Sequence, residues 1–263
     1  MIIDMHAHIY PEKIADKAVN SICDFYSIPM YGRGTIPDLL EKGKAAGVSK
    51  FLVHSTATKP EQVNHINDFI MASCNTNEEL IGFGTLHPGM TDSYDEVTRV
   101  IKGGLKGIKL HPDFQTFNID DPDAYHLYEA CENRIPILIH MGDYRYDYSR
   151  PDKLAKILEL FPKLTVIAAH FGGWSRWQES FDVLAGKQLY MDTCSSLEFI
   201  DGQMVRKFVD KHGADKFFFG TDYPMWDIKK ELEIFDSLPL TDNEKELILG
   251  RNACRFLNIK YQD

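Results

Sequence analysis

Two histidines, His6 and His8, lie two residues apart near the start of the chain, in the segment Asp4-Met5-His6-Ala7-His8. If this segment is a strand, both side chains point to the same face, because side chains alternate along a strand with a period of two. Imidazole nitrogens on one face can bind a single metal ion, and histidine is the commonest metal ligand. The alternative is a polar strand end with two solvated histidines. Further ligands at other strand ends would favour the metal site.

The elements that would position such ligands can be predicted from the pattern of apolar residues. Short apolar, β-branched or aromatic runs predict eight strands. These are Ile2–His6, Lys50–His54, Ile81–Leu86, Gly107–Leu110, Ile137–His140, Thr165–Ala169, Leu189–Asp192 and Phe217–Gly220. Amphipathic stretches between them predict helices. These are Ile36–Ala46, Glu61–Cys74, Ser93–Ile101, Asp123–Asn133, Pro151–Phe161, Gln203–Lys211 and Lys229–Ser237.

This alternation of strand and helix predicts a parallel sheet with right-handed crossovers. The nearly continuous apolar run Thr165–Ala169 indicates a sheet buried on both faces. Eight such units in 263 residues fit an α/β fold of the (β/α)8 TIM-barrel type, formed as one domain over residues 1–263. A doubly wound open sheet is the competitor. It would place a glycine-rich loop after the first strand, and Asp4–Tyr10 contains no glycine.

Reactive residues gather where the predicted strands end, which is where a barrel of this type carries its active site. Seven of the ten histidines lie at this rim, together with a lysine and two aspartates. They are His6, His8, His54, His87, His111, His140, His170, Lys109, Asp192 and Asp222. The other three histidines, His65, His126 and His212, fall on predicted helices. Scattered surface histidines would not show this distribution.

Residues 10–34 are the least periodic part of the chain. They predict a loop insertion after the first strand, with a short helix near Glu12–Asn20. A lid or substrate loop is the functional interpretation, and a surface excursion is the alternative.

Composition narrows the class of protein. Hydrophobic residues make up 44% and charged residues 26% of the chain, which is ordinary for a soluble globular protein. The net charge of −10 argues against nucleic acid and against an anionic membrane surface as partners. Five scattered cysteines form no CxxC pair, which suits a reducing cytoplasm. We find no signal peptide and no apolar run long enough to span a membrane, so the expected location is cytoplasmic.

The rim pattern resembles the amidohydrolase superfamily, in particular its amidohydrolase-related (amidohydrolase 2) branch of metal-dependent hydrolases and non-oxidative decarboxylases. The resemblance covers nearly the whole chain. It is carried by Ile3-Asp4-Met5-His6-Ala7-His8, Gly107-Ile108-Lys109-Leu110-His111-Pro112, Ile139-His140, Ala169-His170-Phe171-Gly172-Gly173, Gly220-Thr221-Asp222-Tyr223-Pro224 and Gly250-Arg251-Asn252-Ala253. The ordered set is far more specific than a single HxH motif.

The resemblance implies a metal site and a proton carrier. The metal ligands would be His6, His8, His140 and Asp222, binding one divalent ion. Zn²⁺ suits these nitrogen and oxygen donors, and Mn²⁺ is the alternative. Asp222 would also take a proton from metal-activated water, and His170 would act as base, acid or oxyanion donor. The structural alternatives are a helix-capping or turn role for Asp222 and a loop-fixing role for His170.

Lys109 opens a choice between one and two metals. Binuclear members of the superfamily carry a carboxylated lysine at this strand, with His140 and His170 on the second ion. Otherwise Lys109 would bind a substrate carboxylate or lie at the edge of the core. The branch that the chain resembles is mostly mononuclear, so one metal per chain is favoured.

Four other rim residues could bind substrate: His54, His111, Arg145 and Trp174. Arg145 lies in a tyrosine-rich loop that could hold an anion and a ring, or could simply be solvated. His111 precedes a proline, so turn chemistry alone would explain it. Trp174 either walls the pocket or packs at a helix start.

Taken together, these residues predict a metal-dependent hydrolase acting on an amide, ester or lactone carbonyl of a small molecule. The alternative is a metal-dependent non-oxidative decarboxylase or hydratase of an aromatic or unsaturated acid, which would use the same ligands. The chain is short for the decarboxylase type, and this places hydrolysis first. A barrel without catalysis, used for binding or metal storage, is the third hypothesis. The expected partner is a small-molecule substrate, with a homodimer as one oligomeric option.

Overall fold

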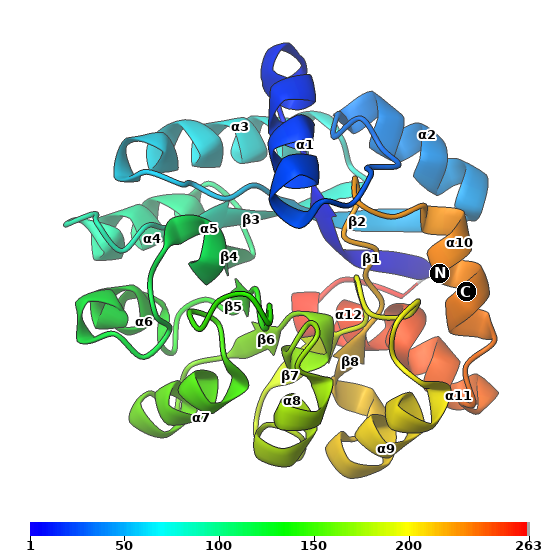
Figure 1. Ribbon diagram of the computed structural model, residues 1–263. Coiled ribbons are helices and arrows are strands. Elements are labelled where there is room, and N and C mark those ends of the chain that lie inside the picture. Colours follow the sequence, from blue (N-terminus) through cyan, green and yellow to red (C-terminus); the bar gives the residue numbers. More distant parts are fainter. Residues whose placement is uncertain (262–263) are drawn as a thin grey trace. The chain divides into compact units, whose positions relative to one another are not determined.

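The computed structural model describes residues 1–261, in two compact units. The first unit comprises Met1–Val53 and Thr193–Asp263, and the second comprises His54–Asp192. Eight strands alternate with helices along the chain and follow sequence order β1 to β8 in one sheet (Figure 1). The predicted (β/α)8 fold class is therefore confirmed. The prediction that residues 1–263 form one domain stays a prediction.

All eight predicted strands are present, most of them shifted by one or two residues at an end. Their bounds are β1 Ile2–His8, β2 Val48–His54, β3 Leu80–Thr85, β4 Gly107–Leu110, β5 Ile137–Ile139, β6 Val166–Ala168, β7 Tyr190–Asp192 and β8 Phe217–Phe218. In the second unit, β3 to β7 pair in parallel, each with the next. Ile108 of β4 pairs with Ile137, and Ile137 pairs with Val166, which stacks buried apolar residues across neighbouring strands.

The seven helices predicted between the strands are present with ends shifted by at most two residues, and further short helices lie outside the predicted ranges. The first unit holds α1 Glu12–Tyr26, α2 Ile36–Ala46, α9 Gly202–His212, α10 Ile228–Asp236, α11 Asp242–Glu246 and α12 Asn252–Leu257. The second holds α3 Val63–Thr76, α4 Ser93–Lys102, α5 Pro112–Gln115, α6 Tyr125–Cys131, α7 Pro151–Leu160 and α8 Trp177–Val183. Among the described residues, no helix is both long and apolar enough to cross a membrane.

Local signals explain several helix ends. Proline stands in the first turn of α2 and α7, where its missing N–H costs nothing. Gly47 ends α2 with φ 79°, a left-handed conformation that favours glycine. Thr241 and Glu244 form a capping box at the start of α11.

The segment expected as a loop with a short helix is mainly helical, which corrects the prediction for residues 10–34. Helix α1 runs for 15 residues, from Glu12 to Tyr26. Only Ala15 and Val19 of this helix, one turn apart, are buried.

The end of this segment is fixed to the turn after β8. The backbone N–H groups of Tyr31 and Gly32 both donate to the carbonyl of Pro224 at 2.9 Å. The hydroxyl of Tyr223 accepts from the N–H of Gly34 at 3.1 Å and donates to Asp38 at 2.6 Å. These bonds hold residues 31–34 beside the turn that carries Asp222.

Candidate metal centre and active site

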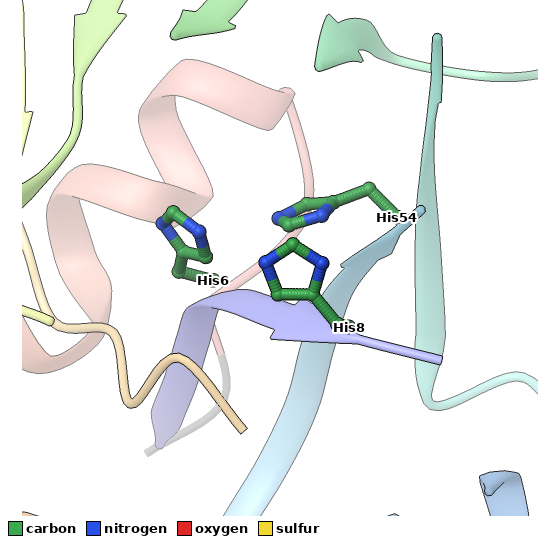
Figure 2. Close-up of side chains that lie close together, drawn as sticks. All are labelled: His6, His8 and His54. Atoms are coloured by element: carbon green, nitrogen blue, oxygen red, sulfur yellow. The ribbon is translucent and has the colours of Figure 1, made fainter. Parts of the chain in front are cut away.

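The first unit brings together three of the four residues predicted to bind metal. His6 and His8 project from the same side of β1 (Figure 2), as the period of two predicts. The nearer carboxylate oxygen of Asp222, Oδ1, lies 3.6 Å from His6 Nε2 and 3.3 Å from His8 Nε2. All three residues are at most 9% exposed.

These separations fit ligands of one ion. Two donors each about 2.1 Å from a tetrahedral metal lie about 3.4 Å apart. A cluster of two imidazoles and one carboxylate also has the donor chemistry of zinc and manganese sites. The structure thus supports a shared-metal role for His6, His8 and Asp222 more strongly than a capping role for Asp222.

Asp4 and Gly220 fix the backbone that carries these ligands. Both carboxylate oxygens of Asp4 accept hydrogen bonds, from the N–H of His6, from the N–H of Thr221 and from the Thr221 hydroxyl. A Cβ on Gly220 would lie 2.9 Å from the Cβ of His6, so only glycine allows this approach. Asp4 therefore locks β1 to the turn after β8, a role that the sequence analysis did not assign.

Two neighbouring residues after β7 contact two of these ligands. Cys194 Sγ lies 3.1 Å from His6 Nδ1, and the Ser195 hydroxyl donates to Asp222 Oδ2 at 2.6 Å. Ser195 and Asp222 have φ values of 52° and 59°, and such strained backbone is concentrated at functional sites. Sequence reasoning missed both Cys194 and Ser195.

The second unit holds a buried histidine and aspartate cluster. His140, just after β5, has its Nδ1 2.9 Å from His170 Nε2 and its Nε2 3.3 Å from Asp113 Oδ2. The backbone N–H of His170 donates to Asp192 Oδ1 at 2.8 Å. His170 has φ 62°, a further strained position among the candidate catalytic residues.

His111 packs flat against His140, with ring centroids 3.9 Å apart and an angle of 8° between the rings. A nitrogen lone pair lies in the plane of its ring, so parallel stacked rings do not direct their lone pairs at one ion. His111 also accepts a hydrogen bond from the N–H of Phe114, which caps α5. This geometry favours a packing and capping role for His111.

Asp113 is a carboxyl of this cluster with a perturbed pKa. Burial, followed by repulsion from Asp143, raises its pKa to about 7, although the hydrogen bond from Ser149 opposes the shift. Its Oδ1 is buried without a hydrogen-bond partner among residues 1–261. Asp113 was missed from the sequence, although it follows His111-Pro112 directly at a strand end.

Lys109 is fully buried in β4. In the parallel register it lies opposite Thr85 of β3 and Leu138 of β5. A charged ammonium in the core needs an anionic partner or a change of chemical state. The core-edge, carboxylated and carboxylate-binding alternatives for Lys109 all stay predictions.

Three weaker candidates have clear local positions. His54 is the fully buried last residue of β2 (Figure 2). Arg145 forms a bidentate ion pair with the buried Asp143 through Nε and Nη2. This pair occupies much of the guanidinium group. Trp174 joins the loops after β5 and β6 through its backbone, because its N–H donates to Met141 and its carbonyl accepts from Asp143. Their substrate roles stay predictions.

The chain matches the family model for amidohydrolases of the amidohydrolase 2 type over residues 3–259. A 2-amino-3-carboxymuconate-6-semialdehyde decarboxylase of Dictyostelium discoideum is 24% identical over 236 aligned positions, which cover 74% of this chain and 66% of that protein. The chain therefore spans slightly less than two thirds of that relative.

Solved structures show the same fold. A 5-carboxyvanillate decarboxylase of Sphingomonas paucimobilis has a TM-score of 0.77 at 16% identity and covers 98% of this chain and 99% of its own. A dihydroxybenzoic acid decarboxylase of Polaromonas sp. JS666, with bound manganese and the inhibitor 2-nitroresorcinol, has a TM-score of 0.75 at 15% identity. Coverage in that pair is 98% of this chain and 96% of the other. Because the family model spans nearly all of the sequence, the chain belongs to the amidohydrolase family.

Proposed function

We propose that this protein is a metal-dependent, non-oxidative decarboxylase of a small aromatic or unsaturated carboxylic acid. The observation that carries the proposal is the cluster of His6, His8 and Asp222, in which the histidine nitrogens lie 3.6 and 3.3 Å from the carboxylate oxygen. From the sequence alone, hydrolysis is the first expectation and decarboxylation its alternative. The relatives named decarboxylases favour its alternative instead.

His140 is proposed as the fourth ligand of one divalent ion, on the basis of the family resemblance and its place at the end of β5. Zn²⁺ and Mn²⁺ both suit the donor set, and the manganese of the Polaromonas relative supports Mn²⁺. When bound, the ion would supply a Lewis acid that polarises a substrate oxygen.

The chain's own residues would move the proton. Decarboxylation breaks the bond to the carboxylate carbon, releases CO2 and places one proton on the remaining carbon. We assign this proton to His170, whose Nε2 shares a hydrogen bond with His140 Nδ1 and whose backbone is held by Asp192. In hydrolysis, Asp222 and His170 would instead transfer the protons of an attacking water.

The expected setting is a small-molecule enzyme of the cytoplasm. All five cysteines are free of disulfides, which supports a reducing compartment. A monomer and a homodimer both fit the proposal.

A single assay separates the two reactions. We expect the metal-loaded protein to release CO2 from members of a panel of aromatic and unsaturated acids that includes 2,6-dihydroxybenzoate and 5-carboxyvanillate. His170→Gln should abolish release while retaining metal. Turnover of amides or lactones without CO2 release would overturn the proposal in favour of hydrolysis.

A further inference from the structure

The two oxygens of the Asp222 carboxylate face different partners. Oδ1 lies 3.3 Å from His8 Nε2 and 3.6 Å from His6 Nε2. Oδ2 accepts the hydroxyl of Ser195 at 2.6 Å, a length typical of a charge-assisted O–H···O⁻ bond. Oδ1 is therefore the oxygen that pairs with the two histidines, and Oδ2 is the oxygen that accepts the Ser195 hydroxyl.

Trp226 determines which way the Ser195 hydroxyl points. Its indole Nε1 lies 2.7 Å from Ser195 Oγ, and an indole N–H can only donate. Ser195 Oγ must therefore accept from Trp226, which leaves its own hydrogen free to donate to Asp222 Oδ2. The sequence of bonds runs in one direction, from Trp226 through Ser195 to Asp222.

The two donors of this hydrogen-bond chain, Trp226 and Ser195, are buried. Ser195 is 4% exposed and Trp226 is 7% exposed. Phe199 packs edge-on against the indole ring, with centroids 5.6 Å apart. Water therefore has little access with which to replace the hydroxyl at Oδ2.

We propose that Ser195, oriented by Trp226, is a positioning residue that occupies Asp222 Oδ2 and so limits Asp222 to one metal-ligating oxygen, Oδ1. The inference rests on the proposed metal site. It predicts that loss of the hydroxyl releases Oδ2. The carboxylate can then rotate or bind through both oxygens, and the affinity for the ion falls because the ligand is no longer held in place. It also explains why the chain holds both Ser195 and Asp222 in left-handed backbone conformations.

The test compares Ser195→Ala and Ser195→Gly with a matched control, Ser196→Ala. Ser196 is adjacent and fully buried, and its hydroxyl donates to the Cys194 carbonyl. The glycine variant removes the hydroxyl and also relieves the left-handed backbone, so it guards against misfolding. Trp226→Phe removes the orienting N–H and keeps an aromatic ring, although a smaller one, at this buried position.

Two measurements are made on each full-length variant. Co²⁺ affinity is measured by competition with a chelator, and coordination by the visible absorption of the Co²⁺-loaded protein, which weakens as coordination number rises. We expect both Ser195 variants to bind Co²⁺ about 10- to 100-fold more weakly, as is typical when an outer-shell partner is lost. Trp226→Phe should lose about 2- to 10-fold, the range of one neutral hydrogen bond.

The outcomes distinguish this inference from the proposed function. If Ser195→Ala and Ser195→Gly match Ser196→Ala in affinity and spectrum, while Asp222→Ala loses Co²⁺, the positioning role is wrong and the metal site stands. If the wild-type protein binds no Co²⁺, the metal site and the inference both fail. Weakened binding with an altered spectrum in both Ser195 variants, a smaller loss of affinity in Trp226→Phe and unchanged binding in Ser196→Ala support the inference.

Discussion

Asp222 is the single residue on which the metal site depends most, because it supplies the only carboxylate of the three clustered ligands. We predict that Asp222→Asn loses the bound metal and at least about 100-fold in CO2 release, the upper range for loss of an outer-shell partner. Asparagine has the same shape, so the fold should persist. Elemental analysis and the CO2 assay measure the two effects.

The control for this prediction is His65→Ala, an exposed histidine on α3. It should leave metal content and activity unchanged. A full equivalent of metal in Asp222→Asn would contradict the assignment of Asp222 as a ligand.

Lys109 decides between one and two metals. We predict one equivalent of metal per chain in the wild-type protein and in Lys109→Met, because a lysine that is not carboxylated contributes no ligand. Methionine fills a similar volume and avoids burying a charge. Two equivalents in the wild type, reduced in Lys109→Met, would instead establish a binuclear site with a carboxylated lysine.

The period-two spacing at a strand end predicts His6 and His8 as a pair of metal ligands, whereas the addition of His140 and Asp222 to this set comes from the family resemblance. Asp4, Asp113 and Ser195 could not be predicted in this way. Their roles depend on tertiary contacts, such as Ser195 with Asp222, 27 residues apart, and Asp113 with Ser149, 36 residues apart. No local pattern encodes which serine or aspartate will face a ligand.

At the scale of secondary structure, the strands were easier to predict than the insertion after β1. Apolar runs buried on both faces give a strong signal, whereas α1 buries only Ala15 and Val19. The tight packing of residues 31–34 against Tyr223 could not be predicted from the sequence, because it depends on the folded chain bringing distant segments together.

A substitution at Gly32 tests this packing. A Cβ there would lie 2.2 Å from the Tyr223 ring, which is itself hydrogen-bonded to Asp38. We predict that Gly32→Ala destabilises the fold by about 1–3 kcal/mol, as overpacking does, and lowers activity by shifting the turn that carries Asp222. Denaturant unfolding measures the first effect. Gly202→Ala, whose nearest contact would be 3.3 Å, is the control, and equal stability of the two variants would contradict the prediction.

Helix α10 carries a buried carboxyl whose protonation should affect stability. Glu231 is 2% exposed, and burial, followed by repulsion from Glu198, Asp4 and Asp222, raises its pKa to about 8. Because the folded-state pKa lies above the unfolded value near 4.5, the folded state is favoured at low pH. That advantage is lost as the pH rises from about 4.5 to about 8.

We therefore predict that Glu231→Gln, which does not ionise, gains stability relative to the wild type as the pH rises over this range. The difference should level off above about pH 8, at up to a few kcal/mol. Chemical denaturation of the metal-free proteins at about pH 5 and about pH 8.5 measures it. Glu233→Gln, half a turn along on the exposed side of α10, should show no such trend. A pH-independent difference for Glu231→Gln would show that Glu231 ionises normally.

For the whole molecule, metal binding should couple to folding. An ion that binds the native state but not the unfolded chain stabilises the fold by about 2.7 kcal/mol at about 100 times its Kd. For a chain of this size, that corresponds to about 5–10 °C in melting temperature. We predict a drop of this order in melting temperature on chelation, reversed by adding Zn²⁺ or Mn²⁺.

The net charge of −10 allows weak binding of cations at the surface, so Mg²⁺ at equal ionic strength serves as the control for that effect. Asp222→Asn tests the origin of the stabilisation: it should melt near the chelated wild type with or without metal. A variant that still gained the full shift from Zn²⁺ would show that the stabilising ion binds somewhere other than His6, His8 and Asp222.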